Sequence, residues 1–279
     1  MHLLRDMEIG VMFWAGRDPV ETIRELKALG ARCGQIGIAG DFPLAGAGAK
    51  WKAALEAENF PVVTAFCAYN GESYADVPTV QRTVGFIPPK TRAEREQRTY
   101  AVSDFAREVG ITSIATHIGF VPEDALDPDY VAVRDLVRRI CDHAAKNKQT
   151  FALETGQEAA DTLLRFFLDV NRPNLGINFD PANMILYGTG DPVEALGTLA
   201  AHVISVHAKD GDWPPKGVPG ALGEEKPLGR GAVGMERFVR KLKSIGFKGP
   251  LNIEREVSDQ KQRLEEIAMG AKLLEDLRR

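Results

Sequence analysis

The sequence has few cysteines, and none of them are paired at short spacing. Only Cys33, Cys67 and Cys141 occur in 279 residues, and no two of them form a Cys-x-x-Cys motif. Zinc sites built from sulfur ligands need such pairs, so this kind of site is excluded. A sparse, odd number of cysteines is typical of reduced thiols. We therefore expect a cytoplasmic protein.

The sequence also lacks an excess of positive charge and a long hydrophobic run. Lys and Arg number 35 against 39 Asp and Glu, which leaves a net charge of −4. Proteins that bind nucleic acids usually carry a basic excess or stripe, so we expect no nucleic-acid partner. No segment approaches the roughly 18–20 apolar residues that a membrane helix needs, and no secretory signal is visible. We therefore expect no membrane partner.

What the sequence does have is an alternation of short apolar segments and longer amphipathic ones. The expected strands are residues 8–13, 33–38, 61–66, 112–117, 150–154, 175–180, 203–207 and 250–254. The expected helices are residues 18–30, 48–58, 91–109, 129–147, 157–170, 191–201, 235–244 and 258–277. This alternation predicts an α/β protein with a parallel sheet. Eight such units without a linker predict one domain over residues 1–279, a single (β/α)₈ TIM barrel.

The competing architecture is a doubly wound sheet that binds a dinucleotide. Such a fold carries a Gly-x-Gly-x-x-Gly turn after its first strand, and residues 13–17 lack it. Two connections, residues 67–89 and 208–232, are longer than ordinary loops between a strand and a helix. We expect both to lie at the catalytic face, where they could close over a substrate and exclude water.

Four consecutive expected strands end in a charged or metal-ligating side chain. These residues are Glu154, Asp180, His207 and Glu254. The C-terminal ends of barrel strands meet at one face, which is where reactive residues lie. Three crowded carboxylates repel one another unless a cation neutralises them. One imidazole and three carboxylates predict a site for one divalent metal ion, Mn²⁺ first, with Mg²⁺, Co²⁺ or Zn²⁺ as alternatives.

The motifs around these residues resemble those of a known family. They are Leu153–Glu158, Asn178–Asn183, Val206–Asp210 and Leu251–Glu256. Over nearly its whole length the chain resembles the xylose isomerase-like TIM-barrel superfamily, of the sugar phosphate isomerase/epimerase type. Ketose 3-epimerases of this superfamily hold one divalent cation with a Glu, an Asp, a His and a Glu on successive strand ends. The resemblance implies that these roles fall on the four residues named above.

The predicted reaction is proton transfer at a carbon beside a carbonyl group. A cation bound to the carbonyl and the neighbouring hydroxyl stabilises the enediolate that forms. Glu154 and Glu254 come from well-separated strands and could flank a substrate, so we predict that they are the catalytic acid and base. The sequence therefore predicts a divalent-metal-dependent isomerase or epimerase acting on a sugar or sugar phosphate.

Seven further residues are candidates for contacts with the substrate. They are Trp14, His117, Glu158, Asn183, Lys209, Asp210 and Arg230. Most have an ordinary structural alternative: Lys209 and Asp210 could pair with each other, and Arg230 could be a solvated loop charge. Asn183 stands where a ketose 3-epimerase typically carries a histidine that contacts the substrate.

Three other functions stay open. A metal-dependent dehydratase acting on a sugar or inositol derivative would begin with the same proton abstraction. An abasic-site endonuclease would need several metals with many histidine ligands, and this chain has only five His. A barrel of this kind could also bind a sugar without catalysis. The expected partner is a small sugar, and a homodimer or homotetramer is common among barrels of the resembling family.

Overall fold

Eight parallel strands close into a barrel in the computed structural model, which describes residues 4–16 and 18–279. The strands of the barrel are β1 (Ile9–Trp14), β2 (Cys33–Ile38), β3 (Val62–Cys67), β4 (Ser113–Thr116), β5 (Thr150–Glu154), β6 (Leu175–Phe179), β7 (Val203–Ala208) and β10 (Leu251–Ile253). They lie in the order β1-β10-β7-β6-β5-β4-β3-β2. This closed order confirms the (β/α)₈ barrel and excludes the doubly wound sheet.

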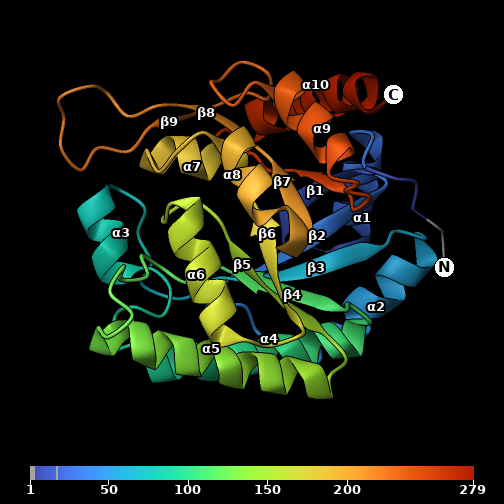
Figure 1. Cartoon of the computed structure of the whole chain (residues 1–279). Coiled ribbons are helices and arrows are strands. Elements are labelled where there is room, and N and C mark those ends of the chain that lie inside the picture. Colours follow the sequence, from blue (N-terminus) through green and yellow to red (C-terminus); the bar gives the residue numbers. More distant parts are fainter. Residues whose placement is uncertain (1–3, 17) are drawn as a thin grey trace.

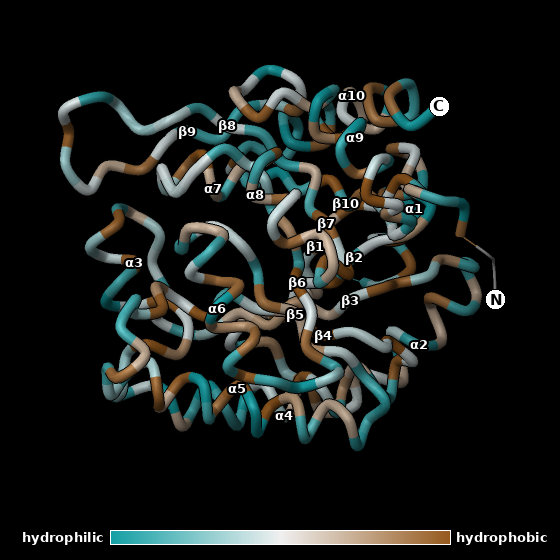
Figure 2. Tube along the Cα trace, viewed as in Figure 1, coloured by the Kyte–Doolittle hydropathy of each residue, from teal (hydrophilic) through white to brown (hydrophobic). Residues whose placement is uncertain are grey.

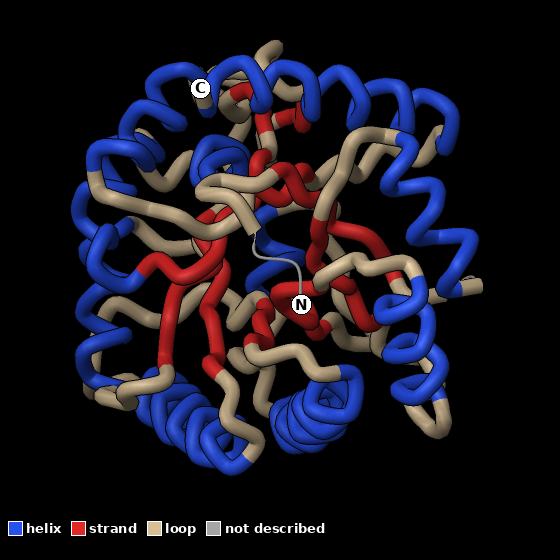
Figure 3. Tube along the Cα trace, turned by 90° about the vertical axis from the view of Figure 1, so that its right-hand side faces the viewer, coloured by secondary structure: helices blue, strands red, loops and turns tan. Residues whose placement is uncertain are grey.

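Helices surround the strands on the outside of the barrel (Figure 1). The longer ones are α1 (Pro19–Ala28), α2 (Ala47–Ala57), α4 (Arg92–Val109), α5 (Pro128–Lys146), α6 (Ala160–Val170), α8 (Pro192–Leu199), α9 (Met235–Ser244) and α10 (Gln260–Arg278). A 3₁₀ turn, η1 (Ala200–His202), follows α8. Figure 3 shows the strands as an inner ring with these helices around it. No helix of the described chain has the length and apolar character needed to cross a membrane.

Aspartate–proline pairs start several of the helices. At α1 the Asp18 carboxylate accepts hydrogen bonds from the backbone N–H groups of Val20 and Glu21, and Pro19 occupies the first turn. These bonds satisfy donors that have no partner within the helix, and proline has a backbone angle already suited to the first turn. The same arrangement starts a short helix that the sequence analysis did not expect, α7 (Pro181–Tyr187), with Asp180 as its N-cap.

The hydrophobic core lies in two places. A large cluster fills the space between the strands and the helices, and a small cluster of Met12, Phe66, Ala115 and Ala152 lies inside the barrel. Figure 2 shows hydrophobic residues along the strands, whereas an outer helix such as α5 alternates between hydrophobic and hydrophilic residues. Burial of each large apolar side chain stabilises the fold by about 1.5–3 kcal/mol. The barrel is therefore a packed scaffold that holds the strand ends in place.

The two long connections contain secondary structure that the sequence analysis did not expect. The first contains a short helix, α3 (Val77–Thr83), and the second an antiparallel hairpin of β8 (Asp210–Asp212) and β9 (Glu224–Lys226). The hairpin projects from the barrel above α3 in Figure 1. The backbone N–H of Val77 donates a hydrogen bond to the carbonyl oxygen of Gly220, at 3.0 Å, which joins the two connections. Closure over a substrate stays a prediction.

Candidate metal centre

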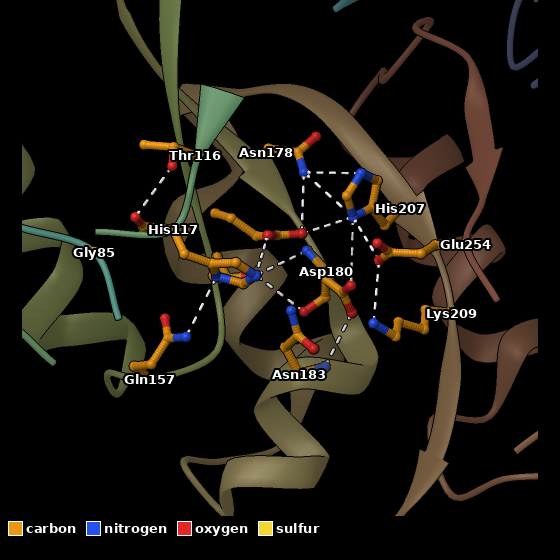
Figure 4. A network of polar contacts seen from close by, with 12 residues as sticks. Gly85, Thr116, His117, Gln157, Asn178, Asp180, Asn183, His207, Lys209 and Glu254 are labelled. Atoms are coloured by element: carbon orange, nitrogen blue, oxygen red, sulfur yellow. Dashed lines mark hydrogen bonds and ion pairs between the residues drawn. The ribbon is translucent and has the colours of Figure 1, made fainter. Parts of the chain in front are cut away.

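The four predicted ligands lie together at the ends of neighbouring strands. Glu154 is the last residue of β5, His207 lies in β7, and Asp180 and Glu254 directly follow β6 and β10. Each offers one ligand atom, and these atoms all lie within 4.8 Å of one another. The Nδ1 atom of His207 lies 2.6 Å from Glu154 Oε1, 3.0 Å from Glu254 Oε2 and 3.5 Å from Asp180 Oδ2. Figure 4 shows the side chains of Asp180, His207 and Glu254 converging.

The carboxylate of Asp180 has one occupied oxygen and one without a hydrogen-bond donor. Oδ1 accepts the backbone N–H of Asn183 at 3.0 Å, which is the N-cap bond of α7. Oδ2 is buried and has no hydrogen-bond partner among the described residues. A buried carboxylate oxygen without a partner is costly, and a bound cation would satisfy it. The donor set, with three carboxylates and one imidazole, also suits a hard divalent ion, so the residues present fit such a cofactor.

A hydrogen bond from across the barrel orients the imidazole of His207. Its Nε2 atom lies 2.9 Å from Oε1 of Gln35, which comes from β2. An amide oxygen only accepts hydrogen bonds, so Nε2 can donate to Gln35 while Nδ1 faces the carboxylates. Gln35 in turn donates to Asn178 Oδ1 at 3.2 Å, and Asn178 donates to Glu154 Oε1 at 3.3 Å. The sequence analysis missed Gln35 and Asn178, although polar residues within otherwise apolar buried strands are a readable signal.

The carboxylates of the cluster stabilise a positive charge between them. Burial disfavours ionisation of Glu154, but His117 and His207 outweigh it and lower the pKa of this carboxyl to about 2. Burial raises the pKa of Asp180 to about 6. Burial opposes a charge on His207 as well, yet Glu254 and Glu154 raise its pKa well above the ordinary value. A proton on the imidazole thus supplies positive charge that a divalent cation could supply instead.

A cavity of about 280 Å³, which we call the inner cavity, reaches the cluster at Glu254, the one member of the cluster among its described lining residues. Its walls combine aromatic rings with acidic and basic groups. The aromatic and polar residues that line it are Trp14, Phe66, Tyr74, Tyr187, Glu72, His117, Asn183, Lys209, Glu225, Glu254 and Glu256. Aromatic walls with a few convergent polar groups are typical of small-molecule sites. The structure therefore brings the predicted residues Trp14, His117, Asn183, Lys209 and Glu254 to one cavity.

Two cationic side chains contact the predicted catalytic glutamates. The Nε2 atom of His117 lies 2.6 Å from Glu154 Oε2, and Glu154 raises the pKa of His117 to about 9 against the opposing effect of burial. The Nζ atom of Lys209 lies 3.2 Å from Glu254 Oε2 and 2.6 Å from Glu256 Oε2. Lys209 therefore pairs with two glutamates at the cavity and not with Asp210, the alternative that the sequence left open.

Two of the predicted substrate contacts lie elsewhere. The buried carboxylate of Asp210 accepts backbone N–H groups from Gly211, Gly229, Gly231 and Val233, so it organises the loop after the hairpin. Arg230 is exposed and lines a separate depression formed with residues of α9 and α10. Neither residue is among the described residues that line the inner cavity. Their contacts with a substrate stay a prediction.

Glu158 is buried behind the site. Its Oε1 atom accepts the backbone N–H of Val121 at 2.7 Å, and its Oε2 atom has no hydrogen-bond partner within the part of the chain that is described. Burial raises the pKa of this carboxyl to about 7. Glu158 is not among the residues that line the inner cavity. Its contact with a substrate stays a prediction.

The sequence analysis missed several residues that line the inner cavity. Glu72 and Tyr74 come from the first long connection, Glu225 from the second, and Tyr187 from α7. The length of the two connections was the only signal, because long ordered loops at a barrel face often carry function.

The fold and the cluster define a (β/α)₈ barrel with a candidate site for a divalent cation at the C-terminal ends of its strands. The chain belongs to the xylose isomerase-like TIM barrel family, whose model matches residues 23–277. A crystal structure of a xylose isomerase domain protein from Planctomyces limnophilus is 43% identical, covers 98% of each chain and superposes with a TM-score of 0.93.

More distant similarities extend over different lengths. An uncharacterized protein from Methanocaldococcus jannaschii is 27% identical over 161 residues, or 53% of this chain and 52% of that protein, so the chain spans about half the length of this curated relative. The structure of 3-keto-D-glucoside 4-epimerase from E. coli has a TM-score of 0.72 at 17% identity, covering 97% of this chain and 99% of that chain. A probable 3-DHS dehydratase from Bacillus anthracis has a TM-score of 0.68 at 14% identity, covering 96% and 99%. At these identities the last two show the fold alone.

Proposed function

We propose that the protein is a divalent-metal-dependent sugar isomerase or epimerase that works by proton transfer through glutamate. The observation that carries this proposal is the buried cluster of Glu154, Asp180, His207 and Glu254, in which Asp180 Oδ2 has no hydrogen-bond partner among the described residues, next to an aromatic cavity. The family and the epimerase fold among its structural neighbours support an enzyme of this kind. Mn²⁺ is the cation that we propose first.

The four residues of the cluster would hold the cation. When bound, it would polarise a carbonyl and the adjacent hydroxyl of the substrate, which makes the C–H bond at that position more acidic. Glu154 and Glu254 would move the proton. In an epimerisation, the carboxylate of one glutamate accepts the proton from carbon, and the carboxyl group of the other returns a proton to the opposite face.

The cationic partners of these glutamates support the assignment. His117 donates to Glu154 Oε2 and Lys209 donates to Glu254 Oε2, so each carboxylate is fixed by a group outside the ligand set. Fixed orientation of the acid and base is a large part of what an enzyme contributes to proton transfer. We propose that His117 and Lys209 hold the two carboxylates at the reacting carbon and also bind substrate hydroxyls.

The charge of the inner cavity favours an uncharged sugar over a sugar phosphate. Glu72, Glu225, Glu254 and Glu256 line it, whereas Lys209 is the one Lys or Arg among its described lining residues. A phosphate group would bring about −1.5 to −2 charges toward these carboxylates. The substrate partner is therefore a small free sugar in this proposal, with no role for nucleic acid or membrane. The homodimer or homotetramer stays a prediction.

Proton exchange with solvent tests the proposal directly. The protein is incubated in D₂O with Mn²⁺ and a panel of free and phosphorylated sugars, and the sugars are analysed by NMR after the metal is removed. We expect deuterium at one carbon of a free sugar without loss of water. Exchange accompanied by loss of water would indicate the dehydratase instead, and no exchange with any sugar would reject the proposed reaction. The Glu254→Gln variant, treated identically, measures the background.

A further inference from the structure

A second cavity adjoins the first on the side of β1 and β10. It has a volume of about 450 Å³ and lies between α1 and the N-terminal half of α10, and we call it the outer cavity. Trp14, Glu254 and Glu256 line both cavities. The two cavities therefore meet at a predicted catalytic glutamate. The proposed proton transfer uses only the inner one.

The indole ring of Trp14 packs against the neighbouring strand at the junction of the two cavities. It pairs in register with Gly37 of the neighbouring strand, and a Cβ atom at Gly37 would lie only 2.6 Å from Cε3 of the indole. Glycine at this position is thus required for the ring to lie where it does. The other side of the ring is not packed, and Trp14 is 43% exposed. A flat, exposed aromatic surface between two cavities is suited to pack against the apolar face of a sugar ring.

The outer cavity offers an apolar floor and a mixed polar rim. Phe13, Leu26 and Ile267 contribute apolar surface. On the rim, Arg255 is already paired with Glu225 at 2.8 Å and with Glu266 at 2.5 Å. Arg263 is half-buried and forms no ion pair with any described residue.

A donor at Arg263 and an acceptor at Glu256 in the same cavity match a ligand with several hydroxyl groups and no net charge. The size of the two cavities points the same way. Pockets for drug-sized ligands have volumes of about 300–1,000 Å³, so the inner cavity at about 280 Å³ suits a single small ring. A longer ligand would have to extend past Trp14 into the outer cavity.

We propose that the outer cavity is a subsite for the second unit of a reducing disaccharide, whose reducing-end unit, the one that provides the carbonyl, lies in the inner cavity. This inference rests on the proposed function and narrows the substrate to an unphosphorylated reducing disaccharide. The second unit would pack on Trp14 and form hydrogen bonds with Arg263 and Glu256.

Gly16 allows the outer cavity to be blocked selectively. It lines the outer cavity and is not among the residues that line the inner one. A Cβ atom at Gly16 would meet no atom within 4 Å, and the backbone there is not in the region that requires glycine. A leucine at this position should therefore extend into the outer cavity without displacing other groups. Gly16→Ala is the matched control, because a methyl group is too small to obstruct the cavity.

The test compares the binding of disaccharides and monosaccharides. Dissociation constants of the reducing disaccharides cellobiose and maltose, of glucose, and of glucose 6-phosphate are measured by NMR titration of the Mg²⁺-loaded protein. We expect at least one disaccharide to bind about tenfold more tightly than its component monosaccharides, which corresponds to about 1.4 kcal/mol. This advantage should disappear in Gly16→Leu and in Trp14→Ala, and persist in Gly16→Ala and Trp14→Phe.

Three results would overturn the proposal. They are the absence of any preference for a disaccharide, a preference that survives in Gly16→Leu, and tighter binding of glucose 6-phosphate that is lost in Arg263→Ala, which would indicate a phosphate subsite. Because the readout is binding, it is independent of proton exchange. Disaccharide binding without exchange of any sugar proton would reject the proposed reaction and leave the disaccharide subsite supported.

Discussion

The two sides of the barrel mouth differ in the chemistry that they contribute. β5, β6, β7 and β10 are adjacent in the closed sheet and lead into the four candidate ligands. The opposite strands end in uncharged residues, namely Trp14, Ile38 and Cys67. We call the first group the charged arc and β1, β2 and β3 the neutral arc. Three carboxylates and an imidazole can share one cation only because their strands are neighbours, about 4.8 Å apart.

Residues of the neutral arc contact the two imidazoles near the candidate metal site and orient one of them. The ring of Phe66 lies 5.6 Å from that of His117 and 5.9 Å from that of His207, measured between centroids, so an aromatic wall faces both imidazoles. Gln35 reaches across the barrel to His207. The four candidate ligands thus come from one arc, while the other contributes the ring of Phe66 and the amide of Gln35 that contact them. Water-excluded surroundings strengthen electrostatic interactions at the site.

The largest expected effect comes from the two glutamates of the charged arc. Replacing Glu154 or Glu254 by glutamine removes the group that accepts the proton while keeping the size of the side chain. We expect the rate of deuterium exchange to fall by about 10²–10⁴-fold in each variant. Glu254→Gln should still bind a cation, as measured by calorimetric titration. The matched control is Glu236→Gln at an exposed position of α9. A near-normal rate in either variant would reject the paired-glutamate scheme.

A smaller change on the same arc tests the ligand role alone. Asp180→Asn keeps the oxygen that caps α7 but removes the negative charge from the side chain that supplies Oδ2. In the wild-type protein, Mn²⁺ at a hundred times its dissociation constant should stabilise the fold by about 2.7 kcal/mol, measured by thermal unfolding with and without the ion. We expect most of this stabilisation to be lost in Asp180→Asn. An equal shift in both proteins would place the cation elsewhere.

A substitution in the neutral arc should weaken cation binding less, because it disturbs the orientation of a ligand and does not remove one. Gln35→Met keeps the length of the side chain but removes the acceptor for His207 Nε2 and the donor to Asn178. Loss of such partners of a ligand typically costs 10–100-fold in metal affinity, and we expect a loss in this range by calorimetry. A loss of metal affinity as large as that in Asp180→Asn would contradict the distinction between the two arcs. An unchanged affinity would show that Gln35 does not orient His207 for metal binding.

The smallest effect concerns Glu158, a buried carboxyl of the charged arc outside the ligand set. Its pKa of about 7 in the folded protein lies above the ordinary value of 4.5, so the folded chain retains a proton that the unfolded chain releases. The resulting stability is fully present below pH 4.5 and is lost as the pH rises through 7. We expect Glu158→Gln, which retains an oxygen for Val121, to flatten the fall in unfolding free energy between pH 5 and 7.5 in urea titrations. An unchanged slope would contradict this assignment.

The sequence was sufficient to predict the barrel and the clustering of four potential metal-ligating side chains, and insufficient for the groups around them. Alternating strands and helices define the topology, and the rule for strand ends selects Glu154, Asp180, His207 and Glu254 without knowledge of contacts. Asn178 was not predicted as a site residue, because its role depends on the strand register that pairs it with Glu154.

One further feature had a local sequence signal, and another depended on tertiary packing. Helix α7 was missed because Asp180 was interpreted only as a strand end, although the Asp-Pro pair that follows β6 is a helix start. The positions of Glu72 and Glu225 at the inner cavity, and of Arg230 outside it, depend on how two long connections pack.

The central claim is that the charged arc binds one divalent cation, and anomalous diffraction from a crystal grown with Mn²⁺ tests it most directly. The account predicts a single strong peak at each barrel mouth, bounded by Glu154, Asp180, His207 and Glu254. A map with no peak between these four side chains, or with the manganese held by other residues, would contradict it.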